Sequence, residues 1–568
     1  MSKQRECPLF RLPIECQNSC KTVDKDTVRE LELVEGENPI YPTLLKMSDD
    51  YRKLTAERIA SNYSDDPIFL THTQELIKNI GDGVIHGSSN YEEIMELRND
   101  IKVETGFIEK YGFVDWEYLK FLNENPLFLQ LLSVYEISSP VLSLALPVLL
   151  LIIPFFVLRV QGHSITISSY TTALQSVLSR HTIGQLFSFN DASWDRKVYI
   201  ILSFVFYIAQ IYYNFESCKK FISNFKAIHA KLDSLRTYLS SSRSRIQETL
   251  SLTSGFDSYS DFNDDLQQVV EHIDNLLERL SKISSYKLAI GKIGEVGEIM
   301  KVFYQLYNTD WVTGTLEYAI QFNSYLDNLT AVAEREEEGK MNKCKLHGKK
   351  TKLKRAFYPS HIDDDPVPNN VDLSKNLIIT GPNASGKTTM LKTTFINVLL
   401  SQQFGYGCYS SATVRPYVTL SCYINIPDTS GRDSLFQAEA RRCIEILRQC
   451  EGESDGRVLC IFDELFSGTN PYEAIGAATA FLEKLNRNKR VEYLITTHFL
   501  DVCKNVGESK RASNLQMKSK MSSGGVNYSY QLVNGVSSVK GGIAVLRQLE
   551  YPSDIVSRSL QVIEGLSL

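Results

Sequence analysis

The residues best suited to chemistry lie between Gly381 and Thr388, in the string Gly-Pro-Asn-Ala-Ser-Gly-Lys-Thr. This string matches the pattern G-x-x-x-x-G-K-[ST] and stands between an apolar run, Asn376 to Thr380, and a helical pattern that begins at Met390. Glycines at both ends allow successive N–H groups to point inward at phosphate oxygens, and the start of the helix offers its positive end to the same anion. The loop therefore predicts a binding site for the phosphates of a nucleotide.

Each side chain of the loop has an expected task. Lys387 is expected to reach the β and γ phosphates, and the hydroxyl of Thr388 is expected to bind Mg²⁺. The other positions are expected to form the cradle around the phosphates: Gly381, Pro382, Asn383, Ala384, Ser385, Gly386 and Thr389.

Two further apolar runs each end in residues that could complete this site. Val458 to Phe462 is followed by Asp463, which is expected to hold Mg²⁺ through water, and by Glu464, which is expected to polarise the attacking water. Taken alone, this acidic pair could be a solvated strand end, but after a phosphate loop we interpret it as a Walker B pair. The run that begins at Val491 ends in His498. A single histidine after a strand is usually incidental, and here we interpret it as a sensor of the γ-phosphate.

Composition limits the classes of protein to which the chain can belong. At 568 residues, with 43% hydrophobic and 23% charged residues, it is a folded chain of more than one domain. A net charge of -6 gives no overall basic footprint of a nucleic-acid binder, although a local basic stripe would suffice. The eleven cysteines form no C-x-x-C pair, and the first residues contain no apolar signal segment. We therefore expect reduced thiols and an intracellular protein.

The pattern along the chain predicts a multidomain protein in which an α-helical N-terminal region precedes an α/β P-loop ATPase domain. Residues 1–45 are polar and are expected to be irregular. Residues 46–335 indicate helices, and residues 336–370 indicate a charged connection. Residues 371–568 contain the motifs and are expected to form the ATPase domain.

Two apolar runs interrupt the helical region at residues 137–157 and 198–215, and neither contains a charged residue. Each is about the length needed to cross a bilayer as a helix. Pro140, Pro147 and Pro154 lie seven apart in the first run, and membrane helices tolerate proline better than soluble helices do. The runs are therefore either transmembrane helices or core helices of a large soluble protein. If they span a membrane, the basic residues after the second run favour a cytosolic ATPase domain.

Four strings in the C-terminal region resemble motifs of one family, the MutS family of ABC-type ATPases. They are, in chain order, TGPNASGKTT (Thr380–Thr389), SLFQAE (Ser434–Glu439), DELFSGTNPYEAIGAA (Asp463–Ala478) and TTHF (Thr496–Phe499). Pro382 and Asn383 are the residues that distinguish the family's phosphate loop from a generic one. Leu435 replaces the family's usual threonine. The closing segment, up to Leu568, also resembles the part of the family that packs across a dimer.

The resemblance implies an ATP hydrolase with ATP and Mg²⁺ as cofactors, in which Glu464 and His498 are catalytic. It further implies a homodimer or a MutS-like heterodimer, in which Ser434 of one subunit meets the ATP held at Lys387 and Thr388 of the other. The mismatch-reading members carry an additional N-terminal domain with a Phe-x-Glu wedge. We identify no such motif, and residues 1–135 indicate short helices, so we expect this chain to lack that domain. The resemblance also implies that residues 46–335 correspond to the family's core and lever region and that residues 371–568 end in a dimerisation segment.

Two functions remain open at this point. The first is a MutS-like, DNA-dependent ATPase of the mismatch-repair type, which couples hydrolysis to the binding of mismatched or structured duplex DNA. The second is a membrane-anchored MutS-like ATPase that acts on membrane-side partners or tethers DNA without reading mismatches. The first fits a soluble cytoplasmic or nuclear protein, and the second an intracellular, membrane-associated protein with its ATPase domain in the cytosol.

Overall fold

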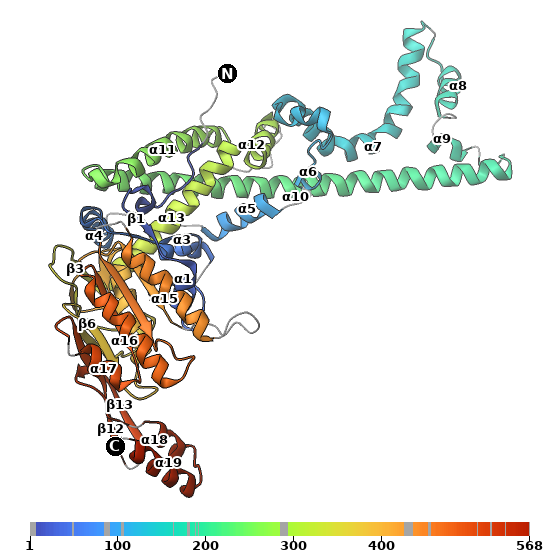
Figure 1. The fold of residues 1–568 in the computed structure, drawn as a ribbon. Helices are drawn as coiled ribbons and strands as arrows, with labels where there is room; N and C mark the ends of the chain where they lie inside the picture. The colour runs from blue at the N-terminus through green and yellow to red at the C-terminus, as the bar shows by residue number, and fades with distance from the viewer. Residues whose placement is uncertain are drawn as a thin grey trace. The chain divides into compact units, whose positions relative to one another are not determined.

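A computed structural model describes residues 7–47, 50–83, 91–103, 107–162, 164–178, 182–187, 189–190, 192–283, 294–424, 435–452, 456–507, 509–522, 525–539 and 541–566 (Figure 1). The chain forms two compact units. The larger unit comprises Pro8–Ser88, Ser244–Val270 and Glu317–Leu568, and the smaller unit comprises Met1–Cys7, Ser89–Arg243 and Glu271–Leu316.

A six-stranded sheet lies at the centre of the larger unit, with the strand order β13-β12-β6-β11-β10-β9. Its strands are β6 (Asn376–Thr380), β9 (Thr419–Tyr423), β10 (Val458–Asp463), β11 (Val491–Thr496), β12 (Ala512–Ser522) and β13 (Gly525–Asn534). Each neighbouring pair in the row β9-β10-β11-β6-β12 is parallel, and β13 pairs antiparallel with β12 at the edge. The central strands are almost continuously apolar because both faces of a parallel sheet are covered.

The register of the sheet brings three strand ends together. Asp463 at the end of β10 pairs with Thr496 at the end of β11, and Thr496 pairs with Ile379 near the end of β6. Because these strands are parallel, the loops that follow them leave from the same edge of the sheet. The phosphate loop, the acidic pair and His498 all follow these strands.

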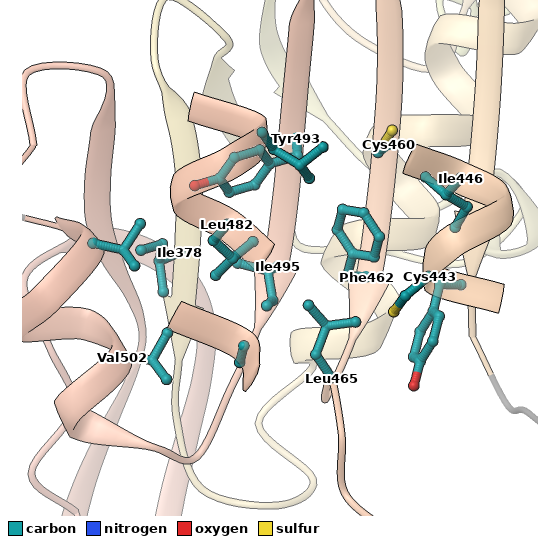
Figure 2. Packing of buried hydrophobic residues seen from close by; sticks show 14 of the residues in the cluster. Ile378, Cys443, Ile446, Cys460, Phe462, Leu465, Leu482, Tyr493, Ile495 and Val502 are labelled. Carbon is teal, nitrogen blue, oxygen red and sulfur yellow. The ribbon is translucent and has the colours of Figure 1, made fainter. Parts of the chain in front are cut away.

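Four helices in the larger unit pack against this sheet: α14 (Lys387–Ser401), α15 (Leu435–Glu451), α16 (Pro471–Arg487) and α17 (Leu500–Gly507). One hydrophobic cluster joins β10 and β11 to α15, α16 and α17, and it includes Phe462, Ile495 and Leu482 (Figure 2). The ring of Phe462 meets that of Phe481 edge to face, with centroids 5.5 Å apart. Helix α14 contacts β10 and β11 as well as strands of the second sheet.

The second sheet has the strand order β5-β4-β8-β3-β7. Its strands are β3 (Asn342–Lys345), β4 (Lys352–Ala356), β5 (Asn369–Asp372), β7 (Tyr406–Gly407) and β8 (Ser411–Thr413), and the short 3-10 helix η5 (Pro359–His361) lies between β4 and β5. Residues 336–370, where the sequence indicates a charged connection, thus contribute β3, β4, η5 and the start of β5. This sheet places η5 beside the start of α14.

The N-terminal residues of the larger unit form short elements. They are η1 (Pro13–Cys16), β1 (Cys20–Thr22), α1 (Lys25–Glu30), α2 (Ile40–Leu44), α3 (Asp50–Ser61), β2 (Asn62–Ser64) and α4 (Pro67–Gly81). Gln402 Nε2 donates to the carbonyl of Ser64 over 3.0 Å, and Arg442 pairs with Asp24 at 2.8 Å. The residues up to 45, which the sequence suggests are irregular, therefore include helices that pack with the motif-bearing part of the chain.

The smaller unit is helical throughout its described residues. It contains α5 (Tyr91–Val103), α6 (Phe107–Tyr111), η2 (Glu117–Glu124), α7 (Pro126–Val160), α8 (Ile167–Leu178), α9 (Thr182–Phe187) and α12 (Val296–Asn308). Three helices run from one unit into the other: α10 (Trp194–Thr253), α11 (Ser260–Ser281) and α13 (Asp310–Glu337). The chain ends in α18 (Gly541–Gln548) and α19 (Ser553–Leu566) of the larger unit. A helical N-terminal region and a C-terminal region with mixed sheets give the multidomain layout that the sequence predicts.

The two apolar runs lie on α7 and α10. By length and composition, both helices contain a stretch that could cross a membrane. In α7 it is Pro126–Ala145, which overlaps the first apolar run and is 17% buried, and the corresponding window of α10 is 6% buried.

Candidate active site

The phosphate loop connects β6 to α14 and depends on its glycines for its shape. Gly386 has φ +89°, and a Cβ added there would lie 3.3 Å from Cδ1 of Tyr530. A Cβ added at Gly381 would lie 2.6 Å from the Oγ of Ser385, which is closer than real Cβ contacts. Ala384 also has a positive φ, of 63°. The loop therefore turns tightly without side chains in the way, as a phosphate cradle requires.

Lys387 is the first residue of α14, and its side chain is 6% exposed. Its Nζ lies 3.4 Å from the carbonyl oxygen of Pro382, 3.3 Å from His498 Nε2 and 3.8 Å from Glu464 Oε1. Burial lowers the pKa of Lys387, and the carboxylates of Glu464 and Asp463 oppose that shift. A buried ammonium group at the start of a helix is well placed to bind an anion.

A hydroxyl and a carboxylate meet beside this lysine. Thr388 Oγ1 donates to Asp463 Oδ2 over 2.8 Å, and the hydroxyl of Thr496 donates to Oδ1 of the same carboxylate. Hydroxyl, carboxylate and water oxygens are the ligands that Mg²⁺ takes at nucleotide sites. Thr388 and Asp463, which the sequence assigns to the metal, are therefore in direct contact.

Glu464 follows β10 in a left-handed conformation, with φ 52°. Its backbone N–H donates to the carbonyl oxygen of Thr496 over 3.2 Å, and its Oε1 lies 2.8 Å from His498 Nε2. The hydrogen bond from His498 is the main cause that lowers the pKa of Glu464, and burial opposes it. The side chains of Glu464 and His498 are 41% and 42% exposed, so both can meet a substrate.

A cavity of about 480 Å³ lies beside the phosphate loop, with Ala384, Gly386 and Thr389 in its lining. Tyr358 and His361 from the η5 region, Met517 from β12 and Tyr530 from β13 contribute to its lining, together with Gly386 of the loop. Two aromatic rings, an imidazole and a thioether beside a phosphate cradle suit a nucleobase, which has apolar faces and polar edges.

Five of the expected site residues come together at the sheet edge: Lys387, Thr388, Asp463, Glu464 and His498. Among the cradle positions, Ala384, Gly386 and Thr389 line the cavity, Pro382 turns its carbonyl oxygen to Lys387, and Gly381 packs against Ser385, whereas Asn383 is exposed. Ser434 lies outside the described residues.

Sequence reasoning missed several residues of this site. Glu439, only 2% exposed, accepts hydrogen bonds from the N–H and hydroxyl of Ser467 and from the N–H of Gly468, and so holds the loop that follows Glu464. Its position at the end of the string SLFQAE was a signal that could have identified it. Thr496, Met517 and Tyr530 had no such signal.

The residues present fit a phosphate group and its metal ion. Ser385 Oγ is buried and has no hydrogen-bond partner among the described residues, although it lies in the loop beside Lys387. A buried hydroxyl without a partner is costly and indicates a group that completes it. The glycine cradle, the buried ammonium of Lys387 and the oxygen pair of Thr388 and Asp463 add the remaining groups that a nucleotide with Mg²⁺ needs.

One string in the smaller unit matches the Phe-x-Glu wedge pattern that the sequence interpretation took to be missing, Phe107-Ile108-Glu109. Phe107 is 6% exposed, and its ring packs against Phe113 and Phe303 with centroids 5.3 Å and 5.6 Å away. A ring buried in this way is not available to stack on a base. The string therefore does not form a wedge.

Comparison with known proteins finds similarity in the C-terminal part. Residues 377–567 match the family model described as MutS domain V. The chain is 27% identical over 206 residues to the DNA mismatch repair protein MutS of Oceanobacillus iheyensis, which covers 35% of this chain and 23% of that protein. It is 27% identical over 203 residues to the DNA mismatch repair protein MutS of Thermus thermophilus, and the match covers 35% of this chain and 24% of that protein. It is 30% identical over 202 residues to the Endonuclease MutS2 of Streptococcus suis, and the match covers 34% of this chain and 25% of that protein.

The chain thus spans about a quarter of the length of these curated relatives. The matched region contains all the residues that meet at the sheet edge. The resemblance to the MutS family is confirmed for the C-terminal part of the chain, where residues 377–567 match the model of MutS domain V.

Proposed function

We propose that the chain is an ATP hydrolase of the MutS type, with a P-loop α/β domain that binds ATP and Mg²⁺, and that it works as a dimer on duplex DNA. The observation that carries the ATPase proposal is the convergence of Lys387, Thr388, Asp463, Glu464 and His498 at the ends of three parallel strands. Ligands of open α/β sheets bind at this edge, outside the carboxyl ends of the strands.

The proposed mechanism follows from the contacts of these residues. Lys387 binds the β and γ phosphates through a buried ammonium group, and Thr388 with Asp463 would hold Mg²⁺. Bound Mg²⁺ neutralises charge that develops on the phosphate oxygens. Glu464, kept ionised by His498, accepts a hydrogen bond from the attacking water and orients it. His498 fixes the carboxylate and lies beside Lys387, where it senses the γ-phosphate.

The dimer part of the proposal rests on the family resemblance and on the chain's last two helices. Ser434 of one subunit would meet the nucleotide of the other. Helices α18 and α19 form an apolar groove, with Ile543, Leu546, Ile555 and Val562 in its lining, which a second copy would cover. The partner is a homodimer subunit or a MutS-like chain.

Duplex DNA is proposed as the partner because two of the relatives are called DNA mismatch repair proteins. Binding through the phosphate backbone would be strongly salt-dependent and nearly independent of sequence. Mismatch reading is not part of the proposal, because Phe107 is buried.

A second candidate is a membrane-anchored ATPase that acts on membrane-side partners or tethers DNA. The exposure of the apolar runs on α7 and α10 favours it. We propose an intracellular, membrane-associated location for this candidate, with the ATPase domain in the cytosol. In this form the same hydrolysis cycle would act at a bilayer.

The test combines nucleotide binding with hydrolysis in the full-length chain. Lys387→Ala should weaken binding of a fluorescent ATP analogue by about thirty-fold or more, because it removes a buried charge that the phosphates need. Lys484→Ala, at an exposed lysine of α16, is the matched control and should bind normally. Duplex DNA should change the hydrolysis rate at low salt and lose its effect as salt is raised. If Lys387→Ala binds the ATP analogue as well as the control does, the ATPase proposal is wrong. If duplex DNA has no effect on hydrolysis at low salt, only the proposal of DNA as the partner is wrong.

A further inference from the structure

The prolines of α7 leave backbone carbonyls without their usual partners. Proline has no N–H, so it cannot donate to the carbonyl four residues before it. Pro140 therefore leaves the carbonyl of Glu136 without a helix hydrogen bond, and Pro147 does the same for the carbonyl of Ser143. In water such carbonyls are hydrated, but in hydrocarbon they must be satisfied by protein groups.

Side chains take over these positions. The hydroxyl of Tyr207, on α10, donates to the carbonyl of Ser143 over 3.3 Å. The hydroxyl of Ser139 donates to the carbonyl of Glu136 over 3.1 Å, and the next carbonyl, that of Ile137, accepts from the thiol of Cys218 at 3.5 Å. The carbonyls four residues before Pro140 and Pro147 are thus satisfied within the protein, the first by a side chain of α7 itself and the second by a side chain of α10.

Two further side-chain hydrogen bonds in this region join α7 to α10. Asn214 Nδ2 donates to Ser143 Oγ over 2.5 Å, and Ser217 donates to Glu136 Oε2 over 2.9 Å. Large apolar side chains of both helices point outward instead; Leu144 is 62% exposed and Phe206 is 67% exposed. Helices that pack in a lipid bilayer place polar groups between them and apolar side chains toward the lipid, as these two helices do.

We propose that α7 and α10 enter a lipid bilayer as one hairpin, in which Ser139 and Tyr207 replace the backbone hydrogen bonds lost at Pro140 and Pro147. This inference rests on the proposed membrane anchoring and specifies how the anchor is built.

Dimensions and charge identify the bilayer as what covers these helices. At 1.5 Å per residue, the 21 uncharged residues from 137 to 157 span about 31 Å, close to the hydrocarbon thickness of about 30 Å. The second run ends at Phe215 and is followed by Glu216 and by three lysines, Lys219, Lys220 and Lys226. Lysines just outside an apolar span favour anionic headgroups on the cytosolic side. A protein partner would not require uncharged runs of this length.

The experiment uses the full-length chain with vesicles of phosphatidylcholine and phosphatidylglycerol. The chain should float with the vesicles and remain with them after an alkaline carbonate wash. Tyr207→Phe should then make trypsin cleave the vesicle-bound hairpin about three- to ten-fold faster, because an unpaired carbonyl in lipid weakens helix packing. Tyr213→Phe is the matched control. It removes a hydroxyl from the same helix, at a residue that is 72% exposed. Ser139→Ala tests the Pro140 position independently.

The outcomes separate the inference from the functions on which it rests. If the chain floats but Tyr207→Phe and Ser139→Ala are cleaved like the control, the replacement of hydrogen bonds is wrong and the anchor stands. If the chain does not float, both the anchor and the hairpin are wrong. ATP hydrolysis is measured on every sample, because the proposed catalytic residues lie in the larger unit. If the unmodified chain does not hydrolyse ATP, the ATPase proposal is wrong, whatever the result of flotation. If only one variant loses hydrolysis, that variant is misfolded, and the other variant tests the hairpin.

Discussion

Single residues of the candidate site are held in place by one another. Glu464 adopts a left-handed backbone conformation, which non-glycine residues rarely do, and Thr496 accepts its N–H. Its carboxylate contacts His498, and both side chains lie beside Lys387. Strained residues that surrounding contacts hold in place are typical of functional sites. The roles of these residues can therefore be separated by substitution.

Glu464→Gln keeps the shape of the side chain but removes its negative charge. We expect this variant to bind ATP and to hydrolyse it about a hundred-fold more slowly or worse, because a neutral amide oxygen polarises the attacking water far less than an ionised carboxylate does. Binding of a fluorescent analogue and single-turnover hydrolysis would measure the two steps separately. A variant that hydrolyses ATP at the normal rate would show that another group activates the water.

The acid side of the pH–rate profile reports on the contact between His498 and Glu464. Since the hydrogen bond from His498 lowers the pKa of Glu464 below its ordinary value of 4.5, the wild-type rate should fall only below that pH. His498→Ala removes this bond, so the pKa rises and the fall should begin at a higher pH. The measurement is kcat/KM for ATP from acid to neutral pH, with recovery of activity at neutral pH as the control for unfolding. An unmoved profile would mean that Lys387 sets the pKa instead.

The sequence predicted much of the site at this scale, because local pattern determines it. The phosphate loop, Asp463 with Glu464, and His498 each follow an apolar run, and the structure brings them together. Tyr530 and Met517 could not be predicted in the same way. They reach the loop only because β12 pairs with β6, and that pairing is a tertiary contact between segments far apart in the sequence.

Elements of the larger unit position the site through a few buried side chains. Helix α15 carries Glu439, which holds Ser467 and Gly468 in the loop after β10. The helix is thereby tied to the strand that carries the acidic pair. A change in α15 is therefore expected to affect hydrolysis without any contact to the nucleotide.

Glu439→Ala tests this link. It leaves the N–H groups of Ser467 and Gly468 without their acceptor, so we expect the free energy of unfolding to fall by about 1–3 kcal/mol and hydrolysis to slow. Glu483→Ala, at an exposed glutamate of α16, should change neither. Denaturant unfolding and steady-state hydrolysis would be compared for both variants. A loss of stability with an unchanged rate would show that the loop does not position Glu464.

Strands of the six-stranded sheet were easier to predict than those of the second sheet. The runs at β6, β10 and β11 are apolar and short, as buried parallel strands are. Strand β4, in contrast, reads Lys-Leu-Lys-Arg-Ala, and its charged residues indicated a solvated connection. Only pairing with β5 and β8 makes it a strand, and single-sequence patterns do not contain that information.

For the whole molecule, the proposed dimer depends on the groove between α18 and α19. Ile555 lines that groove and is 45% exposed in the single chain. Ile555→Asp should therefore convert a dimer into a monomer and reduce hydrolysis, because a buried unpaired charge opposes association. Sedimentation equilibrium with ATP present would measure the change. Ile68→Asp, at a 60% exposed position of α4, is the control and should remain dimeric. Equal masses for both variants would contradict this interface.

Domain organisation was the hardest property to predict, because distant segments share one unit. Residues 8–88 join the motif-bearing part through contacts such as Gln402 with Ser64 and Arg442 with Asp24. Nothing in the local pattern of the N-terminal segment indicates these partners. Helical content, by comparison, was predictable from periodicity along most of the first 335 residues.

Helix α10 runs without a break for 60 residues, from the apolar run to Thr253. Each residue of an α-helix advances the chain by about 1.5 Å and rotates it by about 100°. The number of residues between the two ends therefore sets an angle as well as a length. Removing two residues from the middle would rotate one end by about 200° relative to the other, whereas removing seven would leave it within about 20° of its original direction. The number of residues in the helix therefore sets the direction in which its last residues face. Insertions or deletions in the helix keep that direction only when they comprise a whole number of turns, such as seven residues.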